Sequence, residues 1–245
     1  GDLKKRNIDC FLEEVDGVDE AAQLQALDRL VELGVKGIAI MPVDSDGIRE
    51  KINQLTDQGI LIITFNSDIL GTNRQCFVGM DNFKSGKTAA GLLGMLTKGK
   101  GKVLAITGYF GNSVNSLRVA GFVEELKESF PELELTGVQS SFDSSAEVEK
   151  ILSNTLENYS NLDGVVVFSG GQAGIARALE KIDESKRPFV IIYDLTKNNI
   201  EMLKNDQVDF LIDQDGFVQG YRSLLMLANQ LQNNKTVTKD ALFTD

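Results

Sequence analysis

The sequence predicts an α/β fold built on parallel β-sheets, and three observations lead to that prediction. Apolar runs rich in Val, Ile and Phe alternate along the chain with segments of helical spacing. Such alternation predicts parallel sheets with right-handed crossovers. The runs lack polar alternation, as strands buried on both faces do. With 245 residues, of which 42% are hydrophobic, the chain can bury the core of one or two compact lobes.

The predicted elements follow in order from the amino terminus. Residues 1–7 are expected to end a polar helix that leads into a strand at residues 8–12, so that a further strand is expected to precede this chain. Residues 18–33 have helical spacing, with Asp16 as a possible cap and Gly34 as a stop. The remaining predicted strands are 35–41, 60–65, 76–79, 102–107, 133–139, 164–168, 188–193 and 208–212. The remaining predicted helices are 45–58, 83–97, 115–129, 145–158, 172–182, 197–204 and 216–232.

Composition excludes several classes of function. The sequence contains no histidine, which removes Ser-His-Asp and Cys-His nucleophilic sites and every metal site that uses histidine. A formal charge of −11 argues against nucleic-acid and anionic-membrane binding by this chain, because both need positive surface. Cys10 and Cys76 lie in apolar runs, so both are expected to be buried free thiols in a reducing compartment. No run approaches the length of a membrane span.

Two glycine-rich segments could bind phosphate. Gly86-Lys87-Thr88 copies the end of a P-loop, but the position five residues before Gly86 holds Asp81 instead of the required glycine. The alternative is a helix whose small residues allow close packing, possibly against another subunit. Ser169-Gly170-Gly171 opens a helix after a strand, where backbone N–H groups could hold a phosphate or a sugar hydroxyl. It lacks the third glycine of a dinucleotide fingerprint.

Polar side chains gather where the predicted strands end. Ligands of open α/β sheets bind outside the carboxyl ends of the strands, so these groups predict a pocket for a small polyhydroxylated molecule. The candidate ligand-binding residues are Asn66, Asp68, Asn115, Arg118, Gln172, Asp194 and Gln214. Asn66 and Asp68 could instead cap a turn, and Asp194 could cap the helix at 197–204. Arg118 is expected in the first turn of its helix, where a cation is unfavourable unless it has a specific partner.

Several short motifs have an order and spacing typical of one family. They are Leu33–Ile40 with Pro42, Phe77–Asn82 followed by Ser85–Ala90, Arg118–Phe122, Tyr193-Asp194, and Ile212–Asp215 with Gln219–Tyr221. Over nearly its whole length the chain therefore resembles the type I periplasmic-binding-protein fold, and more closely the effector-binding domain of LacI/GalR-type bacterial transcription regulators. The ribose-type sugar-binding proteins share the pattern.

The resemblance assigns roles to individual residues. Asn66 occupies the position of an aspartate that takes ligand hydroxyls. Arg118 matches an arginine that donates to sugar oxygens, and its planar fork suits two vicinal oxygens. Asp194 matches an acid that accepts from hydroxyls, and Gln214 matches an amide at a crossing between lobes. Where many of these regulators have Asn-Asp, this chain has two glycines, so that Gln172 is expected to supply the missing polar contact.

The resemblance also implies an architecture and a role. It implies two Rossmann-like lobes with a ligand cleft between them, residues 1–81 with 216–233 in the N-terminal lobe and residues 82–215 with 234–245 in the C-terminal lobe. Ligand would close the cleft and alter the geometry of a homodimer, and thereby operator DNA affinity, through an N-terminal DNA-binding head that is absent from this chain. We therefore expect a cytoplasmic sugar-effector domain of a LacI-family regulator.

This interpretation includes no enzymatic activity, no cofactor, no metal and no membrane partner. The alternative is a periplasmic sugar-binding protein of an ABC transporter or sensor, which would carry an export signal and work as a monomer. An enzyme would need an acid/base pair, for which Asp68 and Asp194 are the candidates.

Overall fold

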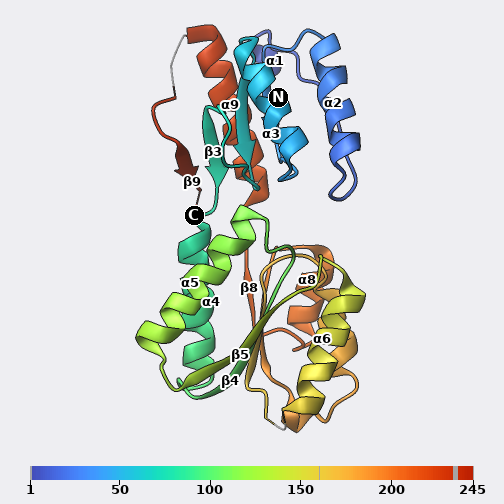
Figure 1. The fold of residues 1–245 in the computed structure, drawn as a ribbon, viewed down its shortest axis with the longest axis vertical. Coiled ribbons are helices and arrows are strands. Elements are labelled where there is room, and N and C mark those ends of the chain that lie inside the picture. Colours follow the sequence, from blue (N-terminus) through green and yellow to red (C-terminus); the bar gives the residue numbers. More distant parts are fainter. Residues whose placement is uncertain (1, 160, 234–236, 245) are drawn as a thin grey trace. The chain divides into compact units, whose positions relative to one another are not determined.

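The computed structural model describes residues 2–159, 161–233 and 237–244. These residues form two compact units. The first unit holds residues 2–80, 215–233 and 237–244, and the second holds residues 81–214. In Figure 1 the first unit combines the blue and red ends of the chain, whereas the second runs from green to orange. Only the second unit is therefore continuous in sequence.

The first unit is a parallel sheet with helices on both faces. Its strands lie in the order β1 (Gly37–Ile40), β2 (Leu61–Phe65), β3 (Cys76–Gly79) and β9 (Ala241–Phe243), all parallel. Helices α2 (Glu20–Glu32) and α3 (Asp46–Asp57) pack on one face, where their apolar residues join those of β1 and β2 in one cluster. Helix α9 (Gly216–Asn233) covers the other face (Figure 1).

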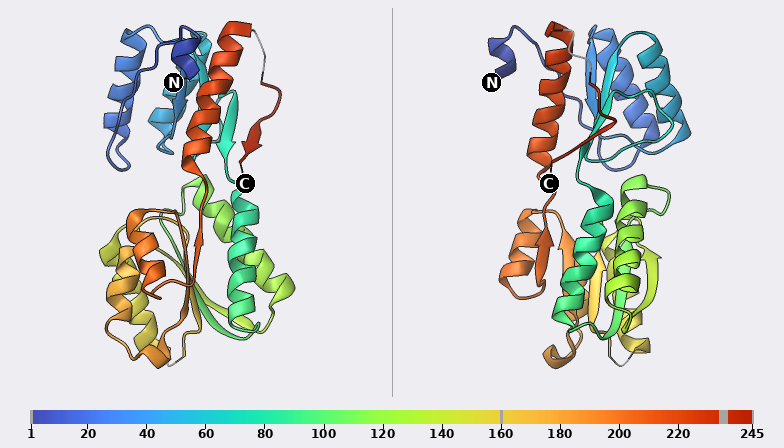
Figure 2. Two further views of the ribbon diagram at one scale, coloured as in Figure 1. Left: turned by 180° about the vertical axis from the view of Figure 1, so that it is seen from behind. Right: turned by 90° about the vertical axis from the view of Figure 1, so that its left-hand side faces the viewer.

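The second unit repeats this plan with five strands. The order is β5 (Leu133–Ser140), β4 (Gly101–Thr107), β6 (Gly164–Val167), β7 (Phe189–Tyr193) and β8 (Phe210–Ile212), again all parallel. Helices α6 (Ser145–Asn158), α7 (Ala173–Leu179) and α8 (Lys197–Lys204) pack against one face. Helices α4 (Asn82–Leu96) and α5 (Ser113–Ser129) lie together on the other face, as the right-hand view of Figure 2 shows.

Two glycines, one in the P-loop-like segment of α4 and one in α5, allow these two helices to pack very closely. A Cβ atom on Gly86 of α4 would overlap the carbonyl oxygen of Arg118 on α5, and a Cβ atom on Gly121 of α5 would overlap the carbonyl oxygen of Phe83 on α4. Gly86 lies inside α4, away from the helix terminus that would bind a phosphate. The small residues therefore serve packing within this unit, and the subunit contact considered from the sequence is not needed to explain them.

The amino-terminal segment differs from the prediction. Helix α1 (Asp2–Lys5) is followed by residues 8–18 without regular structure, so the strand predicted at residues 8–12 is wrong. Cys10, predicted to be buried, is exposed, whereas Cys76 is buried, and both are free thiols. The apolar composition of residues 8–12 favours a strand, but a strand requires a neighbour with which to share hydrogen bonds.

The carboxyl-terminal segment also departs from the prediction. Residues 234–245 were assigned to the C-terminal lobe, but β9 pairs with β3, and Val78 of the first unit lies opposite Leu242. Residues 234–236 and 245 of that assignment lie outside the described residues. A short 3₁₀ helix at Glu184–Lys186 was not predicted. Among the described residues no helix has the length and apolar character that crossing a membrane requires.

Candidate functional site

Arg118 is the centre of a polar cluster at the carboxyl ends of the second unit's strands. Its Nε donates to Oδ1 of Asn82 at 2.9 Å, its Nη1 donates to the carbonyl oxygen of Phe168 at 2.5 Å, and its Nη2 donates to Oε1 of Gln214 at 3.0 Å. Gln214 in turn donates through Nε2 to Oδ1 of Asp194. The cluster thus joins residues that follow β6, β7 and β8 to a side chain on α5.

The Arg118 guanidinium is buried against an aromatic ring. Only 3% of the residue is exposed, and Cζ lies 4.3 Å from the centre of the Tyr193 ring, a cation–π geometry. Burial lowers the pKa of Arg118, and the neighbouring Tyr193 and Asp194 oppose that change. The three acceptors named above are neutral oxygens. The carboxylate of Asp194 is connected to Arg118 indirectly, because Gln214 hydrogen-bonds to both residues. Keeping a cation in such a place is costly unless a partner compensates for its lost hydration.

Tyr193 is held in place by the same cluster. Its hydroxyl lies 3.1 Å from the Ser85 hydroxyl on α4, and either oxygen can donate. Burial raises the pKa of Tyr193, whereas Arg118 and the Ser85 hydrogen bond lower it. The phenol is therefore kept neutral beside the guanidinium, and its ring supplies a rigid wall for Arg118.

Asp194 adopts a left-handed backbone conformation at the end of β7. Its φ is 74°, which is uncommon for a residue other than glycine. The N–H of Asp194 donates to the carbonyl oxygen of Ile212 at 2.9 Å, and Nδ2 of Asn199 donates to its carbonyl oxygen at 2.9 Å. Thr196 caps α8, since its hydroxyl accepts from the Asn199 N–H. The capping alternative for Asp194 is therefore wrong, and its carboxylate is directed to Gln214.

Gln172 and Asn115 support the neighbouring strand ends. Gln172 is buried and donates through Nε2 to the carbonyl oxygen of Tyr193 at 3.2 Å. Asn115 is buried at the start of α5 and donates through Nδ2 to the carbonyl oxygen of Tyr109 at 3.4 Å. Helix α5 begins at Ser113, so Arg118 lies two residues further from the helix terminus than predicted, in the second turn instead of the first. These two amides therefore border the cluster, but neither bonds to Arg118 in the contacts that define it.

Asp143 places a carboxylate at the glycine pair after β6, while the ligand contact expected of Gln172 stays a prediction. Oδ1 of Asp143 accepts from the N–H of Gly170 at 2.8 Å. The Ser169 hydroxyl beside it is buried and has no hydrogen-bond partner among the described residues. Phe142, which precedes Asp143, is exposed and packs edge-on against Tyr109 at 5.5 Å between ring centres. The carboxyl edge of this sheet thus offers a carboxylate and two aromatic rings besides the Arg118 cluster.

Asn66 in the first unit has the same backbone arrangement as Asp194 in the second. It follows β2, its φ is 62°, and its N–H donates to the carbonyl oxygen of Val78 on the next strand at 3.1 Å. Strain of this kind is concentrated at functional sites. The sequence prediction for Asn66 stays a prediction, because its position in the first unit alone does not assign a ligand to it.

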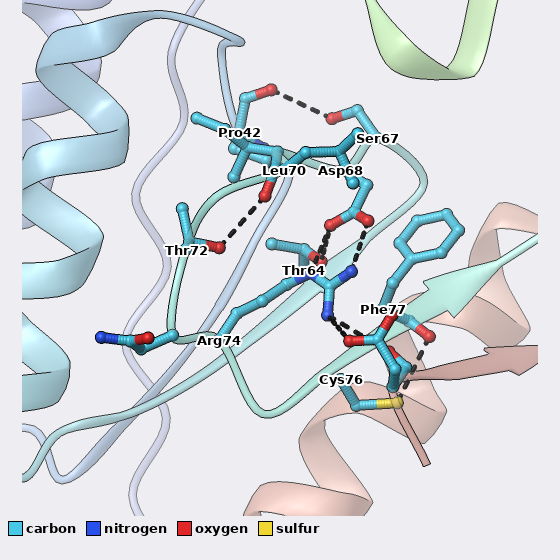
Figure 3. A network of polar contacts seen from close by, with 12 residues as sticks. Pro42, Thr64, Ser67, Asp68, Leu70, Thr72, Arg74, Cys76 and Phe77 are labelled. Atoms are coloured by element: carbon cyan, nitrogen blue, oxygen red, sulfur yellow. Dashed lines mark hydrogen bonds and ion pairs between the residues drawn. The ribbon is translucent and has the colours of Figure 1, made fainter.

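Asp68 is engaged in a salt bridge within the first unit. Its two carboxylate oxygens accept from Nε and Nη2 of Arg74 at 2.5 and 2.6 Å, and Oδ1 also accepts from the Thr64 hydroxyl at 2.7 Å (Figure 3). Arg74 also contacts the Asp240 carboxylate at 2.8 Å. Burial lowers the pKa of Arg74, but Asp68 and Asp240 together raise it above its ordinary value. The geometry favours a structural role for Asp68 over ligand binding.

The cluster offers hydrogen-bonding groups of both kinds. It combines the donors of Arg118 with the acceptor of Asp194, a pairing suited to a molecule that carries hydroxyl groups. Among the residues described, no three Cys, Asp or Glu side chains are grouped closely enough to hold a metal ion. Sequence reasoning missed Asn82 and Asp143, which reach the site from other segments. Asn82 directly follows a helix cap, Asp81, and was visible only as part of a motif.

Comparisons with known proteins find similar sequences over most of the chain. The sequence pattern described as the periplasmic binding protein domain matches residues 3–235. The D-allose-binding periplasmic protein of Escherichia coli is 23% identical over 243 residues, which cover 96% of this chain and 78% of that protein. The ribose import binding protein of Bacillus subtilis is 23% identical over 215 residues, which cover 87% of this chain and 68% of that protein.

A solved structure agrees at the level of the fold. A solute-binding protein of an ABC transporter from Burkholderia graminis, solved in complex with D-arabinose, superposes with a TM-score of 0.85 at 24% identity. The match covers 94% of this chain and 80% of that one. The prediction of two α/β lobes of the type I periplasmic-binding-protein kind is thereby confirmed.

The regulator interpretation is wrong. The relatives are a D-allose-binding periplasmic protein and a ribose import binding protein, and none of the proteins reported above is a LacI-family regulator. The prediction of transcription regulation falls with it, as does that of a cytoplasmic location. The motifs misled because the regulators and the sugar-binding proteins share one fold, and motifs of a fold do not specify a cellular role.

Proposed function

The chain belongs to the periplasmic binding protein domain family, and from that premise we propose that it binds a sugar outside the cytoplasm as the solute-binding component of a transport system. Family members are binding proteins, so the proposal includes no enzymatic step. Because the relatives are named for allose and ribose and a similar structure holds arabinose, the proposed ligand is an unphosphorylated pentose or hexose.

The buried Arg118 guanidinium is the observation that carries the proposal. It donates hydrogen bonds to Asn82 and Gln214 and lies over the Tyr193 ring. The Gln214 amide also donates a hydrogen bond to Asp194. A sugar hydroxyl both donates and accepts, so it can accept from the guanidinium and donate to the Asp194 carboxylate. Charge-assisted hydrogen bonds of this kind are about twice as strong as neutral ones. Exposed Phe142 provides an apolar surface for a sugar ring near the same strand edge.

Calorimetric titration tests the proposal directly. We expect D-ribose, D-allose or D-arabinose to bind the unmodified chain, and Asp194→Asn to weaken that binding. Asparagine keeps the shape of the side chain and tolerates a positive φ, but it loses the charge. A hydrogen bond to a charged group contributes about 1.5–3 kcal/mol, so we expect a loss of about 10- to 150-fold in affinity.

Arg118→Lys is the second variant, because lysine retains the cation without the planar fork. Arg177→Ala is the control, since Arg177 is an exposed residue of α7 that forms a salt bridge with Glu149. Circular dichroism should show that all three variants are folded. If none of these sugars binds the unmodified chain, or if Asp194→Asn and Arg118→Lys bind as tightly as Arg177→Ala, the proposal is refuted.

Two sequence predictions remain open under this proposal. A homodimer was predicted as part of the regulator interpretation, and a solute-binding protein does not require it. Closure of the two lobes around the ligand also stays a prediction. Sedimentation with and without the bound sugar measures both the mass of the species and any change in its compactness.

A further inference from the structure

Asp143 lies in a turn of unusual backbone conformation at the strand ends of the second unit. Phe142 and Asp143 have φ angles of 54° and 58°, and a left-handed conformation is an outlier for a bulky residue such as phenylalanine. The N–H of Phe142 donates to the carbonyl oxygen of Gly108 at 3.0 Å. Oδ1 of Asp143 accepts from the N–H of Gly170 at 2.8 Å. Strain that neighbours hold in place in this way is concentrated at functional sites.

A small gap beside the Gly108 backbone is bordered by two side-chain oxygens. A Cβ atom on Gly108 would lie 2.5 Å from Oδ1 of Asp143 and 2.7 Å from Oγ of Ser169, so both oxygens face the same point. The Ser169 hydroxyl is buried and has no hydrogen-bond partner within the part of the chain that the structure describes. A buried polar group in this condition is costly to keep. A ligand group that reaches Ser169 would offset that cost.

The groups at this gap are suited to a positively charged donor. A carboxylate only accepts hydrogen bonds, and the Gly170 N–H that donates to Asp143 is neutral and leaves its charge uncompensated. The Phe142 side chain is 59% exposed and contacts Tyr109 edge-on, so an aromatic surface, which attracts cations, lies next to the carboxylate in sequence. A protonated amine carries a positive charge and donates several hydrogen bonds. A sugar hydroxyl would leave the carboxylate charge unbalanced.

We propose that the ligand of this chain is an amino sugar, and that Asp143 and Ser169 recognise its protonated amino group. The inference rests on the proposed function and names the class of sugar that the site selects. Asp143 binds the ammonium group through a charge-assisted hydrogen bond. The Asp143 side chain is exposed, so it can turn outward with the ammonium group and open the gap to the Ser169 hydroxyl.

One monosaccharide is large enough to contact Asp143 and the Arg118 cluster together. Arg118 donates to the carbonyl oxygen of Phe168, and Asp143 accepts from the N–H of Gly170, two residues further along the chain. Two residues of extended chain span about 7 Å. Both groups therefore lie against the same strand end. Arg118 and Asp194 are suited to the hydroxyl groups of the sugar, and Asp143 is suited to its amine.

Paired sugars test this inference by calorimetric titration of the full chain. D-glucosamine and 6-amino-6-deoxy-D-glucose are compared with D-glucose, and D-galactosamine is compared with D-galactose. The titrations are done at about pH 6, where an amine is protonated. We expect at least one amino sugar to bind about 10-fold more tightly than its parent sugar, or better, because its hydrogen bond to Asp143 joins two charged groups.

Asp143→Asn is the variant that isolates the charge. Asparagine can still accept from the Gly170 N–H and tolerates a left-handed backbone, but it is neutral. It should bind the amino sugar about 10-fold more weakly than the unmodified chain does, and it should bind the parent sugar about as well. Glu134→Gln is the matched control, since Glu134 is an exposed carboxylate near the start of β5 and its loss changes the net charge equally.

Gly108→Ala tests the gap itself. Its Cβ atom would press on Asp143 and Ser169, whose side chains can move aside, so the fold is retained while the gap is filled. Gly111→Ala is the control, because a Cβ atom there meets nothing within 4 Å. Only Gly108→Ala should lose the preference for the amino sugar. Ser169→Ala should weaken that preference without lowering the thermal stability of the free chain, because it removes an unpaired buried hydroxyl.

The inference is overturned if no amino sugar binds more tightly than its parent, or if Asp143→Asn and Glu134→Gln bind the amino sugar equally well. An equal preference in Gly108→Ala and Gly111→Ala would also overturn it. Titration of the unmodified chain with D-ribose, D-allose and D-arabinose separates this failure from failure of the proposed function. Binding of those sugars without any preference for an amine refutes the amino-group assignment alone, whereas the absence of binding by every sugar tested refutes sugar binding as well.

Discussion

Replacement of Gly86 by alanine tests the packing that positions Arg118. Gly86 faces α5, and its added Cβ atom would lie closer than 3.0 Å to three backbone atoms, the carbonyl oxygen and carbon of Arg118 and the N–H nitrogen of Phe122. Real Cβ atoms essentially never approach this closely. Backbone atoms inside a helix cannot turn away as a flexible side chain can, so α4 and α5 must separate or tilt.

The expected loss of stability can be derived from a matched pair of substitutions in one helix. Gly91 lies in the same helix, and a Cβ atom there would meet nothing within 4 Å. Both substitutions gain about 1 kcal/mol of helix propensity, so this gain cancels in their difference. Overpacking a well-packed core costs about 1–3 kcal/mol. We therefore expect Gly91→Ala to stabilise the protein by about 1 kcal/mol, and Gly86→Ala to be about 1–3 kcal/mol less stable than Gly91→Ala.

Urea unfolding followed by circular dichroism measures this difference, and sugar titration measures its functional consequence. The displaced carbonyl belongs to Arg118 itself, so movement of α5 should shift the guanidinium relative to Asn82 and Gln214 and weaken sugar binding. Gly121→Ala, which would overlap the carbonyl oxygen of Phe83 from the other helix, should behave like Gly86→Ala. If Gly86→Ala and Gly91→Ala unfold at the same urea concentration, the two helices are not in the contact described here.

Other predictions concern the first unit and the Tyr193 hydroxyl. Asp68→Ala should destabilise the protein by about 3–5 kcal/mol in thermal or urea unfolding, because the Arg74 guanidinium would lose its buried carboxylate partner. The Arg74 side chain is only 6% exposed. Asp46→Ala removes a carboxylate that is 97% exposed and paired with Arg49, and it should change stability by less than about 0.5 kcal/mol; a comparable loss in both variants would contradict the structural role of Asp68. Since burial raises the pKa of Tyr193 in the folded state, its contribution to stability is fully present below the unfolded value of 10.0 and is lost as pH rises through the folded value. Tyr193→Phe should therefore unfold with a weaker dependence on pH above 10 than the unmodified chain, and equal alkaline sensitivity of the two proteins would count against this pKa shift.

Most of the fold was accessible from the sequence because its strands are buried on both faces. Runs such as Val165–Val167 between helical segments leave little choice of structure, and the observed bounds of β6 and β7 differ from the predicted ones by about a residue. The failures occurred where pairing, not composition, decides the structure. Residues 8–12 have the composition of a strand but no neighbour within the described chain, whereas residues 241–243 form β9 because β3 offers them a free edge.

The candidate site was predictable in part. Arg118, Asp194 and Gln214 were identified because each follows a strand or stands at a helix start, and the structure joins them in one chain of hydrogen bonds. Asp68 satisfied the same sequence criterion, but its carboxylate is bound to Arg74, six residues away, and no local pattern reveals that pairing. Asp143 contacts Gly170 across 27 positions of sequence, so its role depends on β5 and β6 ending on either side of β4.

The pairing of β9 with β3 has a consequence for the order in which the chain can fold. The N–H of Thr244 donates to the carbonyl oxygen of Gly79, 165 positions earlier in the sequence, whereas residues 81–214 form a unit from one uninterrupted segment. During synthesis that middle segment is complete while α9 and β9 have not yet been made. Since domains fold as units during synthesis and distant contacts form slowly, the unit that holds the chain's beginning is the last to become native.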